Sequence, residues 1–227
     1  MAALHFAQIT DRGLVRTQNE DALWSSPWDA KLFLKKGALF VIADGLGGLP
    51  KGEVASRMAV ETVAEAYESF WERPESGWLH RAFLKANAAI CGQNARSPRN
   101  QAMATTLTAS WFFGDRFTVA HVGDCRLYRV RGGEALPLTR DHAEGRHALT
   151  RAVGLEDNLE VDVFTEDFIK SDVYLQASDG LYPLLTPKEI AETAQSLEPD
   201  AACRRFVELA KSRGGPDNVT VQVIRVV

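Results

Sequence analysis

Cysteine is scarce in this sequence, and its number is odd: the 227 residues include only Cys91, Cys125 and Cys203. A small, odd set argues against a framework of disulfide bonds and favours a reducing compartment. The first residues also lack the basic stretch and apolar core of a secretion signal. No run of about 18 apolar residues occurs, so we expect no membrane span and a cytoplasmic protein.

Several common catalytic patterns are missing as well. No Gly-x-Ser-x-Gly turn is present for a serine hydrolase, and the five histidines form no His-Glu-x-x-His zinc pattern. Cys91 and Arg96 are spaced one residue short of the thiol-phosphatase loop, and no apolar strand leads into Cys91. Residues 45–51 resemble a phosphate-binding P-loop only superficially, because Pro50 replaces its second glycine. These absences argue against a serine or cysteine nucleophile.

Basic residues are not in excess either. Lysine and arginine total 26 against 30 aspartates and glutamates, a net charge of -4, so no nucleic-acid-binding surface is indicated. No proline- or serine-rich linker, charge block or internal repeat divides the chain. We therefore predict one domain over residues 1–227, with the composition of an ordinary globular protein, 45% hydrophobic and 25% charged.

Acidic residues, by contrast, recur where apolar runs begin or end. The run Leu39–Ala43 leads directly into Asp44, although aspartate is depleted in strands and a carboxylate at a core edge is costly unless paired or metal-bound. Taken alone, Asp44 is equally consistent with a turn. Similar placements recur at Glu20-Asp21, Asp124, Asp179 and Asp217. Such carboxylates would repel one another, and a cluster of divalent cations is the simplest physical solution.

All the candidate ligands are oxygen donors: Glu20, Asp21, Asp44, Asp124, Asp179 and Asp217. Hard oxygen ligands select Mg²⁺ or Mn²⁺ over Zn²⁺. Two such ions about 3.5–4 Å apart can activate a water and hold a phosphoryl oxygen, so no protein nucleophile is needed. Arg16 can pair with phosphate oxygens, although a solvated surface charge is the alternative interpretation.

Hydrophobic periodicity predicts the order strand, two helices, several strands, two helices, strand. Predicted strands cover 4–10, 38–43, 105–113, 116–122, 127–131, 134–138, 159–166, 172–178 and 218–226, and predicted helices cover about 50–73, 77–94, 187–194 and 198–212. Residues 24–37 are predicted as a loop, and the four strands within 103–138 as one antiparallel meander. This order indicates an α+β fold with two packed sheets flanked by helices.

An ordered set of short motifs runs along the whole chain. The motifs are Arg16-x-x-Asn19-Glu20-Asp21, Asp44-Gly45-Leu46-Gly47-Gly48, Thr105-Thr106, Gly123-Asp124-Cys125-Arg126, Leu138-Thr139-Arg140-Asp141-His142, Leu149-Thr150-Arg151-Ala152-Val153-Gly154, Ser178-Asp179-Gly180 and Asp217-Asn218-Val219-Thr220. From about residue 6 to 227 the chain resembles the metal-dependent serine/threonine protein phosphatases of type 2C, in their short bacterial form. The resemblance implies a four-layer αββα sandwich of two antiparallel sheets flanked by helix pairs.

The resemblance also implies an activity and a cofactor. The enzyme would hydrolyse phosphoserine and phosphothreonine in proteins through a metal-bridged hydroxide, as a monomer opposing a bacterial serine/threonine kinase. The cofactor would be Mn²⁺ or Mg²⁺, two ions in the core site with a possible third. Asp44 would bridge the two ions; Glu20 and the Gly45 carbonyl would serve one ion, and Asp179 and Asp217 the other.

The resemblance assigns roles to three further positions. Asp21 would hold metal-bound water, Asp124 would form a third metal site with Asp179, and Arg16 would bind the substrate phosphate. Leu46 stands where some eukaryotic relatives carry a histidine proposed as general acid, so the leaving group must be protonated by metal-bound water or another residue. His142 is interpreted either as a proton donor or as a loop cap.

The segment 143–148 is short where relatives usually carry a longer helical flap. Six residues cannot form a substantial lid, so we expect an open cleft with little discrimination among peptides. In the alternative, the loop 24–37, with Trp24 and Trp28, takes over the role of the flap. Two other functional classes stay open: a phosphatase-fold regulator without activity, and a two-metal phosphodiesterase or nuclease.

Overall fold

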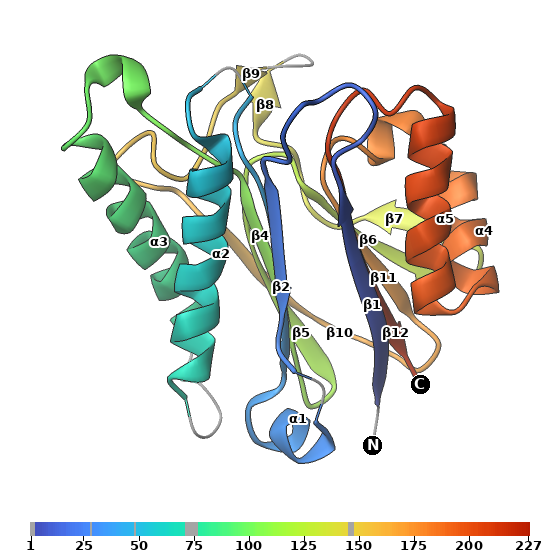
Figure 1. Cartoon of the computed structure of the whole chain (residues 1–227). Helices are drawn as coiled ribbons and strands as arrows, with labels where there is room; N and C mark the ends of the chain where they lie inside the picture. Colours follow the sequence, from blue (N-terminus) through green and yellow to red (C-terminus); the bar gives the residue numbers. More distant parts are fainter. Residues whose placement is uncertain (1–2, 28, 48, 71–76, 145–147) are drawn as a thin grey trace. The chain divides into compact units, whose positions relative to one another are not determined.

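The apolar runs of the sequence form two five-stranded antiparallel sheets, each accompanied by a pair of helices (Figure 1). This computed structural model describes residues 3–227 except 28, 48, 71–76 and 145–147. Contacts within the chain group it into two compact units. Unit 1 comprises Met1–Asn19, Cys125–Asp141 and Phe168–Val227, and unit 2 comprises Glu20–Asp124 and His142–Asp167.

The sheet of unit 2 has the strand order β10-β5-β4-β3-β2. Its strands are β2 (Asp21–Ser25), β3 (Ala38–Asp44), β4 (Leu107–Phe113), β5 (Arg116–Val122) and β10 (Asp162–Asp167). The helices α2 (Gly52–Glu68) and α3 (Trp78–Asn94) pack against each other and against this sheet (Figure 1). Every residue of β3 before Asp44 is buried, as the continuous apolar run predicts.

The sheet of unit 1 has the strand order β1-β12-β11-β6-β7. Its strands are β1 (Leu4–Asp11), β6 (Arg126–Arg131), β7 (Glu134–Pro137), β11 (Val173–Ala177) and β12 (Val219–Val226). The helices α4 (Pro187–Ser196) and α5 (Pro199–Ser212) cover one face of it (Figure 1). Both helices begin with proline, and Thr186 and Glu189 form a capping box at the start of α4.

The prediction of a loop over residues 24–37 is wrong. The start of this stretch continues β2, and its second half is the helix α1 (Ala30–Lys36), which Asp29 caps by accepting a hydrogen bond from the Leu32 amide at 2.8 Å. Pairing with β3 and an edge contact between Trp24 and Tyr67 stabilise β2. These partners lie far away in sequence, so tertiary contacts override the weak local pattern.

The prediction of one four-stranded meander is also wrong. β4 and β5 form a hairpin in unit 2, whereas β6 and β7 form a hairpin in unit 1. The chain leaves one sheet for the other at Gly123 and Asp124, and the positive φ of Gly123 (107°) permits this change of direction. Periodicity identifies strands but not the sheet to which they belong.

The remaining elements are short. β8 (Ala143–Glu144) pairs with β9 (Ala148–Leu149), and two 3₁₀ turns occur at Arg99–Gln101 and Tyr182–Leu184. The first predicted helix, about 50–73, is shorter in the structure, because α2 ends at Glu68; residue 73 and Gly48 lie outside the described residues. The three cysteines form no disulfide bond. Among the described helices, none is long and apolar enough to cross a membrane.

Candidate active site

Four of the predicted carboxylates belong to unit 2: Glu20, Asp21, Asp44 and Asp124, all of them half-buried. The register of β2 and β3 places Asp21 directly opposite Asp44. Side chains in such pairs lie about 5 Å apart at Cβ, and like charges there are destabilising. The strand pairing therefore imposes a repulsion that a bound cation would relieve.

The backbone of Asp44 is fixed by two buried threonines that precede β4. The Thr106 hydroxyl accepts a hydrogen bond from the Asp44 amide, and the Thr105 hydroxyl donates one to the Asp44 carbonyl, each at 2.8 Å. The Thr106 amide also donates to that carbonyl at 2.8 Å. The sequence motif contained both threonines without assigning them a role; the structure shows that they hold the end of β3 in place.

Two glycines bring the turn after β3 against the start of α2. A Cβ on Gly45 would lie 2.4 Å from the Gly52 carbonyl, and a Cβ on Gly52 would lie 3.1 Å from the Glu20 carboxylate. At Gly45 only glycine permits this approach, because the contact is with backbone atoms. The Ser56 hydroxyl donates to the Glu20 carbonyl at 2.6 Å, and the Gly45 amide donates to the same oxygen at 3.1 Å. Glu20 is thereby held beside Gly45, as the ligand prediction requires.

His142 holds the turn that carries Asp124. Its Nδ1 accepts a hydrogen bond from the Gly123 amide at 3.1 Å, so the ring proton is on Nε2, which lies 3.0 Å from a carboxylate oxygen of Asp162. Burial raises the pKa of Asp162, but the contacts with His142 and Arg151 lower it more, and the net shift is downward. Of the two interpretations of His142, this geometry favours the loop cap.

The other three predicted residues, Arg16, Asp179 and Asp217, belong to unit 1. Asp179 and Asp217 lie beside the neighbouring strands β11 and β12, where Gly180 packs so closely that a Cβ would be 1.8 Å from the Asn218 carbonyl. Arg16 Nη2 donates to Asp217 Oδ2 at 2.7 Å, with the arginine side chain 40% exposed. Arg16 is therefore oriented by a carboxylate, and its side chain stays partly exposed to solvent.

Asn218, to which the sequence analysis assigned no individual role, ties the segment around Arg16 to β12. Its amide group donates to the Arg12 and Gln18 carbonyls, both at 2.9 Å. Gly13 has φ of 76°, and a Cβ there would lie 2.1 Å from the Asp217 carbonyl. The only signal in the sequence was the position of Asn218 directly after an acidic candidate.

The donor set fits a hard divalent cation. Carboxylate and carbonyl oxygens are the predicted ligands in both units, and such donors suit Mg²⁺ and Mn²⁺. The close packing of Gly45, Gly52 and Glu20 shows that side-chain bulk is kept away from these oxygens. Within the described residues, the predicted ligands are divided between the units, and no group of three or more histidine, cysteine or acidic residues forms a metal-binding cluster.

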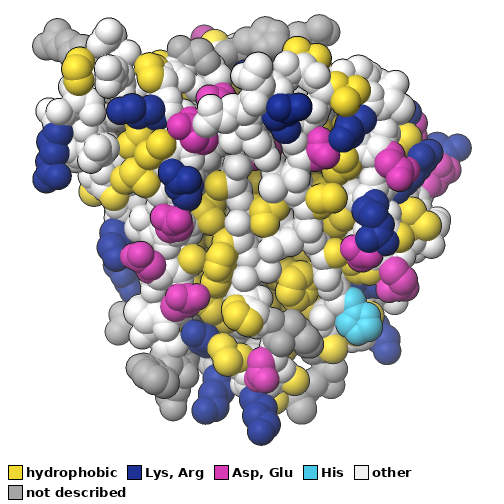
Figure 2. Space-filling view, in the orientation of Figure 1, with side chains coloured by type: hydrophobic (Ala, Val, Ile, Leu, Met, Phe, Trp, Pro, Cys, Tyr) yellow, Lys and Arg dark blue, Asp and Glu magenta, His cyan; other side chains and the backbone are white. Residues whose placement is uncertain are grey.

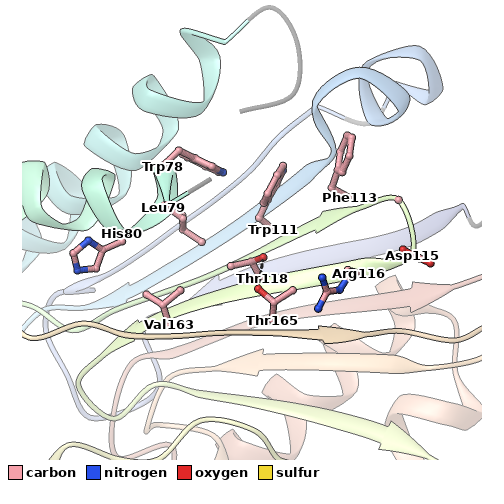
Figure 3. Close-up of a pocket in the computed structure, with 12 residues that line it drawn as sticks. Trp78, Leu79, His80, Trp111, Phe113, Asp115, Arg116, Thr118, Val163 and Thr165 are labelled. Carbon is pink, nitrogen blue, oxygen red and sulfur yellow. Dashed lines mark hydrogen bonds between the residues drawn. The ribbon is translucent and has the colours of Figure 1, made fainter. Parts of the chain in front are cut away.

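A hollow of about 710 Å³ lies at the other end of the unit 2 sheet (Figure 3). Trp78, Trp111 and Phe113 line it, with Asp115 as its one acidic residue. This hollow lies beside the β4–β5 turn. In the register, that turn lies next to Ala38, the first residue of β3, whereas Asp44 is the last residue of that strand. A single carboxylate cannot supply the ligands of a divalent metal site, so we assign the catalytic chemistry to the acidic end of the sheet.

The loop 24–37 is also at the wrong end of the sheet to replace a flap. α1 connects Ser25 to Ala38, and Ala38 lies six residues along β3 from Asp44, which is about 20 Å at 3.3 Å per residue. Trp28 itself lies outside the described residues. The described part of 143–148 forms the short β8–β9 pair and contains no helix.

Comparison with known proteins identifies the family. The sequence pattern of the family described as Protein phosphatase 2C matches residues 17–213. The serine/threonine protein phosphatase PstP of Mycobacterium tuberculosis is 32% identical over 242 aligned positions, gaps included. The alignment covers 99% of this chain but only 45% of PstP. The serine/threonine phosphatase stp of Listeria monocytogenes is 30% identical over 97% of this chain and 95% of its own length.

A solved structure confirms the predicted fold class. The crystal structure of the catalytic domain of PstP in complex with two manganese ions has a TM-score of 0.86, 36% sequence identity and full coverage of both chains. The chain spans less than half of full-length PstP of Mycobacterium tuberculosis, and it matches the whole of the crystallised PstP catalytic domain. This chain therefore belongs to the protein phosphatase 2C family of serine/threonine phosphatases.

Proposed function

We propose that residues 1–227 form one catalytic domain that hydrolyses phosphoserine and phosphothreonine in proteins and depends on Mn²⁺ or Mg²⁺. The observation that carries this proposal is how the acidic set is held: Thr105 and Thr106 fix the backbone of Asp44, and Arg16 pairs with the carboxylate of Asp217. A regulator without activity would not need the carboxylates kept in these positions. The retained set therefore favours an active enzyme.

The proposed metal ligands follow the donor set described above. Asp44 would bind two ions, Glu20 and the Gly45 carbonyl would complete one site, and Asp179 and Asp217 the other. The crystal structure of the PstP catalytic domain in complex with two manganese ions supports this number. When bound, the ions would lower the pKa of a water and neutralise charge on the phosphoryl group.

A third ion would be held more weakly by Asp124 together with Asp179. Asp124 lies in a turn that His142 and Gly123 fix through two hydrogen bonds, so its backbone position is defined without a metal. We propose this as an additional site, separate from the two ions of the core.

Arg16 would bind and orient the substrate phosphate. Guanidinium donors form bidentate bonds to phosphate oxygens, and Asp217 holds the guanidinium group in place. Asp21 would accept a hydrogen bond from the attacking water and orient it. Leu46 carries no proton to donate, and the Nε2 proton of His142 is engaged by Asp162. The leaving alkoxide would therefore take its proton from water.

Phosphoproteins suit the surface better than nucleic acids do. In Figure 2, lysine and arginine side chains alternate with aspartate and glutamate over the coloured part of the face shown, and they form no basic stripe there. The net charge is -4. Both observations disfavour a nuclease. We further propose that the enzyme is a cytoplasmic monomer and opposes a cognate serine/threonine kinase.

The test is hydrolysis of p-nitrophenyl phosphate with Mn²⁺, with Mg²⁺ and with EDTA. We expect activity only with metal, and loss of most activity in Asp44→Asn and Asp179→Asn, with Asp115→Asn as the matched control at an exposed turn. Without metal, both variants should stay folded, because removing a carboxylate relieves repulsion. Wild type, but not these two variants, should gain melting temperature with Mn²⁺. Full activity in EDTA or a trapped phosphoenzyme would overturn the proposal.

A further inference from the structure

Two large aliphatic side chains stand exposed directly before Arg16. Leu14 is 59% exposed and Val15 is 66% exposed. Exposed aliphatic residues are common when they occur singly. Here two are adjacent in sequence, and they immediately precede the residue proposed to bind the substrate phosphate.

The segment that carries this pair is held in place. The Leu14 amide donates to the Gly215 carbonyl at 2.9 Å, and the Val15 amide donates to the same oxygen at 3.3 Å. A Cβ added to Gly215 would lie 3.1 Å from Leu14 Cγ, so the leucine side chain lies against this glycine. Asn218 fixes the segment on both sides of the pair through the Arg12 and Gln18 carbonyls.

This fixed backbone reduces the entropy that a binding partner would have to remove. A pre-organised contact surface gains affinity mainly because little ordering is left to occur on binding. Leu14 and Val15 are therefore better suited to contact a ligand than the same residues on an unanchored loop would be.

We propose that Leu14 and Val15 contact an apolar side chain close to the phosphorylated residue of the protein substrate. The inference rests on the proposed function, because it takes the phosphate to be bound at Arg16. Two residues of extended chain span about 7 Å, so Leu14 can be no farther than this from Arg16 at Cα. The same spacing separates a phosphoresidue from its second neighbour in an extended peptide.

The expected preference is modest. Covering about 40 Å² of apolar surface at 25 cal/mol per Å² corresponds to about a fivefold change in kcat/KM. The enzyme would therefore favour apolar over polar neighbours of the phosphoresidue by about fivefold. This value stays within the weak discrimination expected for a short 143–148 segment.

The experiment compares two phosphothreonine peptides that differ only in the residues flanking phosphothreonine, leucine in one and serine in the other, at fixed Mn²⁺. Wild type should show a kcat/KM ratio of about five, and the double variant Leu14→Ser, Val15→Ser a ratio near one. The matched control is Ile169→Ser, another exposed aliphatic residue of unit 1 (52% exposed), which lies beyond the other end of β12. It should keep the wild-type ratio. The ratio does not depend on the fraction of folded enzyme.

Each outcome is decisive. A ratio near one in wild type, or an unchanged ratio in the double variant, overturns the inference while leaving the proposed function intact. The double variant could instead leave the kcat/KM ratio unchanged and change only how the sedimentation coefficient depends on protein concentration. Leu14 and Val15 would then lie at an interface between two copies of this chain, and the inference would be overturned as well. If wild type with Mn²⁺ does not hydrolyse p-nitrophenyl phosphate, the proposed function itself fails and this inference fails with it.

Discussion

Replacing Thr106 by valine tests how the structure positions Asp44. The Thr106 side chain is buried, and its hydroxyl accepts the hydrogen bond from the Asp44 amide at 2.8 Å. Valine has nearly the same shape, so the close packing of Gly123 against this side chain should survive. The substitution thus removes the hydroxyl that accepts the hydrogen bond of the Asp44 amide and changes little else in the shape of the side chain.

The loss in stability can be worked out from this geometry. Removing the acceptor of this part-buried amide should cost about 1–3 kcal/mol. An unfolding entropy of about 2.1 cal/mol/K per residue gives about 0.5 kcal/mol/K for a chain of this length. The melting temperature should therefore fall by about 2–6 °C.

The effect of the substitution on Mn²⁺-dependent activity should be specific to Thr106 and should not be seen when another buried threonine is replaced. Displacing the end of β3 should raise the Mn²⁺ concentration for half-maximal activity by about tenfold, as is typical when groups supporting a metal ligand are removed. Thr108→Val is the matched control, because Thr108 is equally buried and its hydroxyl bonds to His121 Nδ1 at 2.8 Å, a bond that does not involve Asp44. It should lower the melting temperature without changing the Mn²⁺ requirement.

The assay is phosphate release from a phosphothreonine peptide over a Mn²⁺ titration, combined with melting curves in EDTA. An unchanged Mn²⁺ requirement in Thr106→Val would refute the positioning role. An equal increase in the Mn²⁺ requirement of Thr108→Val would show that any loss of stability in this sheet weakens metal binding.

Three further predictions concern other parts of the molecule. Arg16→Ala should raise KM for small phosphate esters more than it lowers kcat, since phosphate binding is its proposed role; a lower kcat with unchanged KM would contradict this. Asp172 is fully buried, and burial raises its pKa, but its bonds to Arg131, the Ile169 amide and Tyr174 together lower it more. Asp172→Asn should therefore lose about 2 kcal/mol at pH 7, an effect that is full above about pH 4 and disappears as the pH falls through the lowered pKa. Urea unfolding of wild type and variant at pH 7 and at a pH below the lowered pKa of Asp172 checks this, and an equal loss at the two pH values contradicts it. Finally, kcat/KM should vary by less than about tenfold across unrelated phosphothreonine peptides; a peptide panel showing a strong preference would reject the open cleft.

The sequence predicted those parts of the fold that depend on local pattern. The buried run of β3 was identifiable because every residue before Asp44 is apolar. The start of α4 was marked by Thr186 and the proline that follows it, and a capping box is found there. Acidic residues beside apolar runs were visible for the same reason, since a carboxylate at a core edge needs a partner.

The remaining features depend on partners distant in sequence. The strands within 103–138 have the same periodicity whichever sheet they join, so their division between two sheets could not be read from it. β2 is short and gains its stability from pairing with β3. The positioning roles of Thr106 and Asn218 became visible only with their hydrogen-bond partners, Asp44 and the carbonyls around Arg16.

Metal-dependent catalysis is tested most directly by hydrolysis of a phosphothreonine peptide by the metal-stripped protein, measured as phosphate release before and after addition of Mn²⁺. We expect no release without metal, and release that begins with Mn²⁺ and stops when EDTA is added in excess. Equal release with and without metal, or no release under either condition, would contradict it.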